Sequence, residues 1–407
     1  MRHILLCALA LCSAPFAPVA GQQASTLTRA QAVAAALAHG PRLAIASADT
    51  MIAAGQLLTA HTIPNPMLSA SYSKSLPKYH VTAEVPLDFI SRRGTRIRSA
   101  DAARTAAQYR FAFDRASVAL DADTTYTRAL AALAHVQLSH RNAVAADSVR
   151  RIAIARRDAG DASELDVQLA TVSSGQAANV AAGDTLALAA TLLDLQALIG
   201  LPTDRITIAP TDSLVAPPSP AGALPATDAT LAVASATASV ESASLAAKLQ
   251  HRSVFLLPSL MFGFDAGDPT GSEPGLLPTF GIALPLPFFN RNRGPIAEAE
   301  AARQRASAEL AFARVESQNR IAQARRTEAG AQARIARDQL LVISANRVAE
   351  MSLAAYREGA VPLATVLEAQ RGAREMLAQY IDDIATAAIA AATLRVLTLT
   401  PSSVSTP

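Results

Sequence analysis

The chain lacks tryptophan and has almost no cysteine. Among its 407 residues there are two cysteines, Cys7 and Cys12, and aromatic residues make up 4%. Both cysteines lie within residues 1–21, where a basic start, an apolar stretch and small residues near position 20 are typical of a secretory signal peptide. We therefore expect a mature protein with no disulfide and no cysteine-bound metal. Leu11 precedes Cys12, where lipidation requires a small residue, and this disfavours a lipid anchor.

A large net charge and long apolar runs are also absent. The formal net charge is +3, too small for this length to indicate a nucleic-acid-binding protein. The best candidate for a membrane-spanning helix, residues 384–399, carries Arg395 and follows two aspartates. A secreted chain of this kind can still enter a membrane through a closed β-barrel, because a barrel pairs all of its backbone groups.

The sequence shows none of the common signatures of catalysis. It has no Gly-x-Ser-x-Gly motif, no phosphate-binding loop and no histidine-rich metal motif. The histidines beyond the signal peptide are scattered, and no two are spaced to share one helical face: His39, His61, His80, His135, His140 and His251. We expect no enzymatic activity, no cofactor and no resident metal site.

The sequence does contain an internal repeat. Residues 84–94 (EVPLDFISRRG) are echoed by residues 283–294 (ALPLPFFNRNRG). Each copy precedes a very long alanine-rich stretch that runs to a glycine, Gly160 in the first case and Gly359 in the second. The prolines at 86 and 285 and the glycines at 160 and 359 are both 199 residues apart (285 − 86 and 359 − 160). The glycines at 94 and 294 are 200 residues apart (294 − 94), and so nearly constant a spacing indicates a duplicated and fused structural unit.

Prolines and glycines divide both units into the same elements. The first unit, residues 22–202, is predicted to hold a helix at 27–60, a β-hairpin at 67–89 and helices at 95–158 and 162–199. A proline-rich, irregular connector follows at 203–225. The second unit, residues 226–399, is predicted to hold a helix at 227–251, a β-hairpin at 254–288 and helices at 295–358 and 361–398, before a tail at 400–407.

Two periodicities support these assignments. Apolar and polar residues alternate from Val81 to Phe89, as in a strand with one apolar and one polar face. The last helix has a seam at three- and four-residue steps over five heptads, which is typical of lengthwise helix packing. Residues 95–158 contain no proline or glycine, and as one helix they would be about 95 Å long.

Four amphipathic strands leave the sheet incomplete. Known membrane barrels begin at about eight strands, so one chain cannot close a barrel. Open edges in lipid would leave backbone groups unpaired, and several chains must therefore share one barrel. Three copies would give about twelve strands. The predicted fold class is mainly α with membrane β: a duplicated β-hairpin and long helical hairpin, with a second, α-helical barrel below the shared sheet.

Two segments carry a resemblance to a known family. They are residues 285–300 (PLPFFNRNRGPIAEAE) and residues 356–370 (YREGAVPLATVLEAQ). With these segments in register with the duplication, the chain resembles the TolC-type outer-membrane channels of tripartite efflux pumps, most closely their cation-efflux (CzcC-like) branch. The resemblance covers essentially the whole mature chain.

The resemblance implies a homotrimer in the outer membrane of a Gram-negative cell. Its shared β-barrel of about twelve strands would open outward, and its periplasmic helical tunnel would narrow at the turns around Gly160 and Gly359. The partners it implies are the membrane lipid, a periplasmic adaptor protein and an inner-membrane RND pump. The channel would be a passive conduit for metal cations or drugs, and the sequence does not name the cargo.

The resemblance also points to a gate. In the family, acidic residues beyond the second turn ring the closed entrance, and the matching position here is Glu368. A second acidic position falls on Thr365, which departs from the family pattern, and Asp166 aligns with it in the first unit and could supply the charge. The alternative for Glu368 is a single solvated surface charge. Threefold symmetry would instead gather three copies into a ring that attracts cations.

Two further sets of residues have expected roles. Arg157 and Arg357 precede the turns at Gly160 and Gly359, where they would contact the adaptor or the last helical carbonyls. The second set is expected to shape the strand-to-helix corners at the membrane surface: Pro86, Gly94, Pro285, Asn290 and Gly294.

Two other functions remain open at this point. A periplasmic coiled-coil scaffold or adaptor would explain the helices but not the duplicated amphipathic hairpins. An outer-membrane channel serving protein secretion would need the same elements, and no residue in the sequence excludes it.

Overall fold

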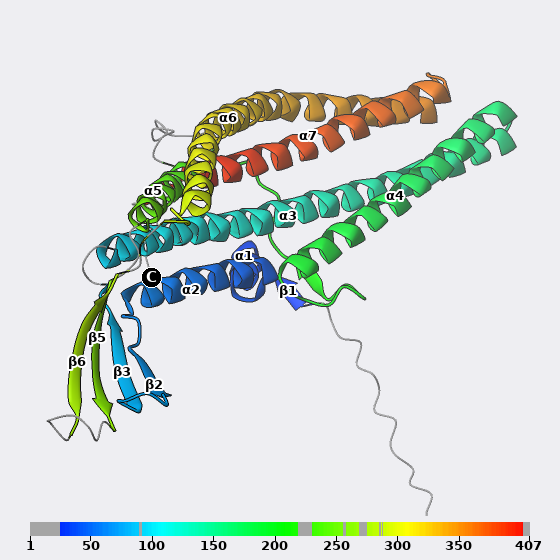
Figure 1. Cartoon of the computed structure of the whole chain (residues 1–407). Coiled ribbons are helices and arrows are strands. Elements are labelled where there is room, and N and C mark those ends of the chain that lie inside the picture. Colours follow the sequence, from blue (N-terminus) through cyan, green and yellow to red (C-terminus); the bar gives the residue numbers. More distant parts are fainter. Residues whose placement is uncertain are drawn as a thin grey trace, which may run out of the picture.

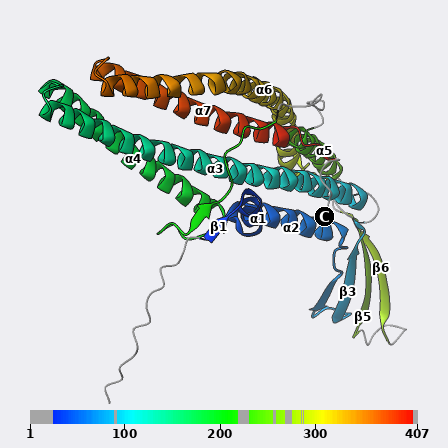
Figure 2. The same cartoon turned by 180° about the vertical axis from the view of Figure 1, so that it is seen from behind.

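The computed structural model describes residues 25–88, 92–218, 230–254, 258–267, 275–284, 286 and 288–401. The predicted signal peptide, Pro285 and most of the predicted tail lie outside these residues. Long helices run side by side along most of the molecule, and a small β-sheet extends from one end of them (Figure 1). The view from behind shows the same arrangement (Figure 2).

Two pairs of long antiparallel helices make up most of the chain. The first pair is α3 (Arg93–Asp158) with α4 (Glu164–Leu198), and the second is α6 (Arg293–Arg357) with α7 (Leu363–Leu397). α3 has 66 residues and α6 has 65, so each is about 100 Å long at the usual rise per residue. Alanine, which favours helix and has a small side chain, lets the paired helices pack closely. α6 continues through Gly330 without a break.

Three shorter helices complete the helical layer near the sheet. They are α1 (Arg29–His39), α2 (Pro41–His61) and α5 (Leu231–Arg252). α2 packs on α3, and α5 packs on both α3 and α6, along the parts that α4 and α7 do not reach (Figure 1). The single helix predicted at 27–60 is wrong. Pro41 disfavours a helical conformation at Gly40 and begins a new helix as its first residue.

The predicted connector is not wholly irregular. β4 (Ile208–Pro210) pairs in parallel with β1 (Ser25–Leu27), so the start of the described chain is held to the junction between the two units. The buried Tyr126 of α3 fixes this contact, because its hydroxyl donates to the carbonyl of Leu27 at 2.8 Å and lies 2.8 Å from Asp212. Sequence patterns did not indicate this pairing, since each strand has only three residues.

The hairpins of the two units join in one antiparallel sheet. Its strands are β2 (Met67–Tyr72), β3 (Tyr79–Pro86), β5 (Ser259–Ala266) and β6 (Leu277–Ala283), in the order β2-β3-β5-β6. The central β3–β5 pair brings together residues about 180 positions apart, such as Val81 with Phe264. The duplication therefore produces one sheet rather than two separate hairpins.

The register separates apolar from polar side chains over the whole sheet. One row across the four strands is Leu68, Ala83, Phe262 and Phe280. The next row, on the opposite face, is Ser69, Thr82, Gly263 and Thr279. Because partners in antiparallel strands point to the same side, one face is apolar and the other mostly polar. Phe262 and Phe280 meet edge to face with ring centroids 6.0 Å apart.

Both outer strands have an unpaired edge. The outward-facing sides of β2 and β6 pair with no other strand in the described part of the chain. The apolar face is also uncovered, since Leu68, Phe280 and Ile282 are each more than two-thirds exposed. Exposure of this apolar face to water is unfavourable, and the unpaired edges leave backbone hydrogen-bonding groups free. The sheet therefore requires an apolar surface against its face and further strands at its edges.

An arginine clamp fixes the corner between the first hairpin and α3. The guanidinium of Arg96 lies 2.5 Å from the buried carboxylate of Asp88. It also donates to the carbonyls of Ala60 at 3.1 Å and Thr62 at 2.8 Å, which end α2. One side chain thus joins the end of α2, the residues after β3 and the start of α3.

Two helices are long and apolar enough to cross a membrane, by length and composition alone: α2 and α4. Choosing residues 384–399 as the best such candidate was therefore wrong. Most of each stretch is exposed in the single chain, including Ile45, Met51 and Leu58 of α2. α4 also carries Glu164 and Asp166 in its first turn. The long core helices of other proteins pass the same test, so it does not make these two helices membrane spans.

Candidate functional site

The helical hairpins turn at the end of the molecule farthest from the sheet (Figure 1). Gly160 and Gly359 have φ angles of 83° and 79°, the left-handed region that glycine adopts without strain. Both turns also have the same closing hydrogen bonds, from Asp161 to the carbonyl of Arg156 and from Ala360 to that of Ala355, each 2.8 Å long. The two units therefore end in equivalent turns, which we call the tip.

Beneath the tip, side chains from all four long helices form a small core. α3 and α6 supply Val149, Ala153 and Tyr356, while α4 and α7 supply Val167, Ala170, Leu363 and Val366. Tyr356 is 2% exposed, and its hydroxyl has no hydrogen-bond partner in the described residues. Burial, and to a smaller extent the charge of Asp166, raises the pKa of the Tyr356 phenol. The two hairpins are thus held together at the tip within one chain.

Arg156 of the first unit binds Tyr356 of the second unit. Its guanidinium lies over the ring of Tyr356, 4.7 Å from the ring centroid, and donates to the Tyr356 carbonyl. It also donates to the carbonyl of Asp161 at 3.1 Å. A side chain on Gly359 would come within 3.3 Å of this guanidinium, so glycine serves both the turn and the contact.

Arg157 and Arg357 have different surroundings from each other. Arg157 lies 2.7 Å from Asp158 and 3.1 Å from Glu164, so it joins the end of α3 to the start of α4. The expectation that Arg157 binds terminal helical carbonyls is wrong, because its partners are the side chains of Asp158 and Glu164. Its neighbour Arg156 binds one such carbonyl, that of Tyr356 in the last turn of α6. Arg357 is exposed and makes no ion pair in the described part of the chain. Contact of either arginine with an adaptor stays a prediction.

The predicted gate residues lie close to the tip on α4 and α7. Asp166 caps α4: its carboxylate accepts from the backbone of Ser163 at 3.3 Å, and its own N–H donates to the Ser163 hydroxyl at 3.2 Å. Thr365 and Glu368 are exposed in the first turns of α7. The structure of one chain brings these three to the same end of the molecule, and their role as a gate stays a prediction.

A groove of about 680 Å³ lies between the two helical hairpins behind the tip. Glu368 and Arg371 of α7 line it, together with Glu350 of α6 and Arg141 of α3. Acidic and basic groups from three helices therefore line the same groove. This arrangement could not be predicted from the spacing of residues along any one helix.

Farther along, α7 carries two adjacent aspartates that face different helices. Asp382 accepts from His135 of α3 at 2.8 Å. Asp383 is 2% exposed and takes two contacts from Arg334 of α6, at 2.8 and 2.7 Å. Asp338 of α6 is also buried and lies against Asp383, and one oxygen of each carboxyl has no donor in the described residues apart from the other acid.

Two carboxyl groups in this position can share a proton. Burial, followed by the contact with Asp383, raises the pKa of Asp338. Burial opposes ionisation of Asp383 as well, but hydrogen bonds from Arg334 and Gln379 outweigh it and lower the pKa of Asp383. Of the two acids, Asp338 thus keeps its proton to higher pH, and Asp383 is the one that ionises more readily, beside Arg334.

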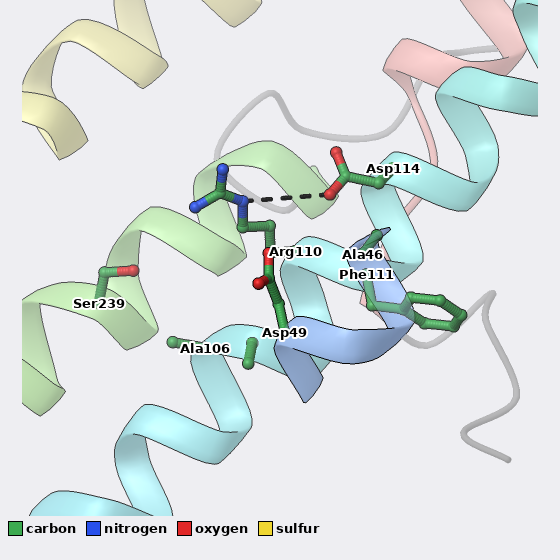
Figure 3. Close-up of a pocket in the computed structure, with 8 residues that line it drawn as sticks. Ala46, Asp49, Ala106, Arg110, Phe111, Asp114 and Ser239 are labelled. Atoms are coloured by element: carbon green, nitrogen blue, oxygen red, sulfur yellow. Dashed lines mark ion pairs between the residues drawn. The ribbon is translucent and has the colours of Figure 1, made fainter. Parts of the chain in front are cut away.

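A smaller hollow of about 340 Å³ lies between α2, α3 and α5 (Figure 3). Arg110 points across it toward Asp114, with 4.0 Å between the charged atoms. Burial raises the pKa of Asp114, while Arg110 and Arg42 counter this and Asp49 adds to it. The charges are balanced by neighbours in the chain, and we interpret the hollow as a packing gap between three helices.

Three of the histidines are less isolated than the sequence indicated. His80, His135 and His251 each pair with one carboxylate, at 2.8, 2.8 and 3.2 Å. Within the residues that the structure describes, no three His, Cys, Asp or Glu side chains gather in a way that could hold a metal ion.

The predicted corner residues divide into two groups. Pro86 ends β3, and Asn290 accepts from the backbone of Asn292 at 2.9 Å. Gly94 and Gly294 lie in the first turns of α3 and α6, and a side chain would meet no atom at either. The left-handed residue at the second corner is Asn292, with φ of 58°. Pro285 lies outside the described residues.

Solved structures share this arrangement over nearly the whole chain. A membrane protein from Pseudomonas aeruginosa matches with a TM-score of 0.76 at 20% identity, over 93% of this chain and 91% of its own. The CmeC outer membrane channel of Campylobacter jejuni matches with a TM-score of 0.76 at 16% identity, over 91% and 85%. The outer membrane protein VceC of Vibrio cholerae matches with a TM-score of 0.74 at 18% identity, over 91% and 96%.

The chain shares the fold of these membrane proteins. No protein-family model and no curated protein sequence matches it. The likeness to the solved structures therefore supports the expected TolC-type fold and leaves the cation-efflux branch as a proposal.

We expect Arg156→Met to loosen the tip. The change removes the cation–π contact and the hydrogen bond to Tyr356 of the second unit, together about 2 kcal/mol. Hydrogen exchange of the amides at 353–370 should become roughly tenfold faster or more. Arg157→Met is the matched control, because Arg157 contacts only its own unit. Equal exchange in the two variants would mean that Arg156 does not hold the hairpins together.

We expect Asp338→Asn to remove a pH dependence of stability. A raised pKa stabilises the fold at low pH, and this stabilisation is lost as the pH rises through the folded-state value above 3.8. As the pH rises, the melting temperature of the wild type, followed by helical circular dichroism, should fall relative to that of the variant, because groups with lowered pKa values such as Asp383 act in the opposite sense in both proteins. Asp101→Asn, at an exposed position of α3, is the control. A wild-type slope kept in Asp338→Asn would contradict the shared proton.

Proposed function

We propose that this chain is the outer-membrane channel of a tripartite efflux system and works as a homotrimer. Support comes first from the fold, which matches outer-membrane channels over 91% of this chain. The observation that carries the proposal is the four-stranded sheet with one apolar face and two open edges, joined to helices of 66 and 65 residues.

The sheet supports a place in lipid. Its apolar face would contact acyl chains, and its polar face, with Ser69, Thr82 and Thr279, would face water inside the barrel. Pairing β6 of one chain with β2 of the next removes both open edges, and three chains make a closed barrel of about twelve strands.

The helices support a tunnel on the other side of the membrane. Each pair extends about 100 Å, far enough to reach well into the periplasm. The exposed apolar side chains of α2 and α4 would be covered by helices of neighbouring chains, as in a ring of coiled coils.

The tip supports a gate and a docking point. Arg156 and the core around Tyr356 hold the two hairpins of one chain together at this end. Opening would separate neighbouring hairpins there, and Glu368, Asp166 and Thr365 would line the entrance. The turns at Gly160 and Gly359, with Arg157 and Arg357, would meet a periplasmic adaptor bound to an inner-membrane RND pump. The cargo would be metal cations or drugs.

The test is ion conduction by the purified, detergent-extracted protein in planar lipid bilayers. We expect discrete channels, blocked by divalent cations added on the side of the tip. Glu368→Ala should weaken this block by about tenfold, because three charges near one axis are removed. Glu309→Ala, an exposed glutamate of α6 paired with Arg305, is the matched control.

Two outcomes would contradict parts of this proposal. A water-soluble protein without conductance would favour the periplasmic scaffold. Normal channels with the same divalent block in wild type, Glu368→Ala and Glu309→Ala would keep the channel and remove Glu368 from its gate.

A further inference from the structure

Apolar residues continue at every second position of the sequence beyond the last strand. Phe280 and Ile282 belong to β6, and Leu284, Leu286 and Phe288 continue the same two-residue alternation toward α6. All five are exposed, Phe288 by 73%. Phe289, the next residue, is fully exposed. Two neighbouring phenyl rings thus stand uncovered at the corner between the sheet and the long helix.

Two unpaired cations follow the aromatic pair. Arg291 and Arg293 are exposed, and neither makes an ion pair or a side-chain hydrogen bond within the part of the chain that the structure describes. Other exposed arginines of α6 pair with nearby glutamates, such as Arg303 with Glu300 and Arg305 with Glu309. The corner therefore presents positive charge that the chain itself does not neutralise.

The first unit uses its corner cations differently. There Arg96 binds Asp88, and Arg93 donates to the carbonyl of His61 at 3.2 Å. With the spacing of 199 residues, Pro287 corresponds to Asp88, and with the spacing of 200 that relates Gly94 to Gly294, Ile296 corresponds to Arg96. The second unit thus has neither partner of the clamp, and its corner arginines have no partner among the residues that the structure describes.

The second corner is nevertheless held in place. Asn292 adopts the left-handed conformation, and its side-chain amide donates to the carbonyl of Gln250 at 2.9 Å and to its side chain at 3.1 Å. Phe289 and Arg291 on one side of Asn292, and Arg293 on the other, are therefore displayed from a fixed bend rather than from a free loop.

We propose that Phe288, Phe289, Arg291 and Arg293 form an anchor for phospholipid headgroups on the membrane leaflet that faces the helices. The phenyl rings would enter the boundary between acyl chains and headgroups, and the guanidiniums would bind phosphate oxygens. This inference rests on the proposed function, because it requires the sheet to lie in a bilayer.

Lipid fits this surface better than a second copy of the chain. The anchor follows a few residues after β6, whose apolar face the register assigns to acyl chains, and its charge is complementary to phosphate. If β6 pairs with β2 of the next chain, the nearest segment of that chain is residues 62–69 (TIPNPMLS), which contains no acidic residue to bind the arginines.

The absence of tryptophan allows a direct test, because one substitution introduces a single fluorescent reporter. Phe289→Trp reports on the anchor, Phe280→Trp on the sheet, and Phe312→Trp on an exposed position of α6 beyond the corner. Each protein is reconstituted in vesicles of phosphatidylethanolamine and phosphatidylglycerol containing lipids brominated near the headgroup or deep in the acyl chain. We expect the fluorescence of the Phe289→Trp variant to be quenched mainly by the shallow bromines.

The three reporters separate the two proposals. Quenching at position 280 without quenching at 289 would overturn the anchor and leave the channel intact. It would also indicate that a neighbouring chain covers Phe289. If no position is quenched, the proposed membrane location fails as well. Quenching at 289 by deep bromines alone would place the arginines too far from the phosphates and would likewise contradict the anchor.

The arginines are tested in the Phe289→Trp background. With equal mole fractions of brominated lipid, phosphatidylglycerol should quench about threefold more strongly than phosphatidylcholine, because the cations enrich anionic lipid. The double variant Arg291→Gln/Arg293→Gln should remove this excess. Arg325→Gln/Arg326→Gln, two exposed positions farther along α6, should keep it. An excess that survives in the first variant would exclude the arginines as headgroup ligands.

Discussion

The unpaired edges of β2 and β6 are the constraint on which the rest of the structure depends. Four strands form a sheet with one apolar face, but the two outer strands leave backbone donors and acceptors without partners. Water could hydrogen-bond to these groups, but contact of water with the apolar face is unfavourable. Lipid makes favourable contacts with the apolar face, but it cannot hydrogen-bond to the backbone groups at the edges. Pairing of edge with edge between copies resolves both demands. The membrane location and the oligomer are therefore consequences of one unfinished sheet.

The long helices also leave apolar side chains exposed in the single chain. Within the chain, a few polar contacts fix the helices to one another. Arg96 and Asp88 set the direction in which α3 leaves the sheet. Asp383 couples α7 to α6 through Arg334 and Asp338, and Arg156 joins the two units at the tip. Between these points the contacts are mainly those of small alanine side chains. Such packing lets whole hairpins shift against one another more readily than a core of large side chains would.

Much of the fold could be predicted from the sequence, because its signals are strong and local. The absence of proline and glycine from residues 95–158 predicted α3, which begins two residues earlier, at Arg93. Alternation predicted the hairpins. The second hairpin is shorter than the predicted range of 254–288, because its strands span only Ser259–Ala266 and Leu277–Ala283. The break at Gly40 and the β1–β4 pair were missed. The first depends on a single proline within a helical pattern, and the second on two strands of three residues from distant parts of the chain. The cation–π contact of Arg156, the charged groove and the Asp338–Asp383 pair join different helices, and no spacing along one helix encodes them.

The most direct test of this account is disulfide cross-linking between the open edges. The only cysteines are those of the predicted signal peptide, so Ser69→Cys in β2 can be combined with Leu277→Cys, Thr279→Cys or Gly281→Cys in β6. Within one chain these edges are about 14 Å apart, too far for a disulfide. For at least one combination, oxidation in membranes should give a ladder that ends at three chains. Monomers alone in every combination, or a ladder that continues beyond three, would contradict the shared barrel.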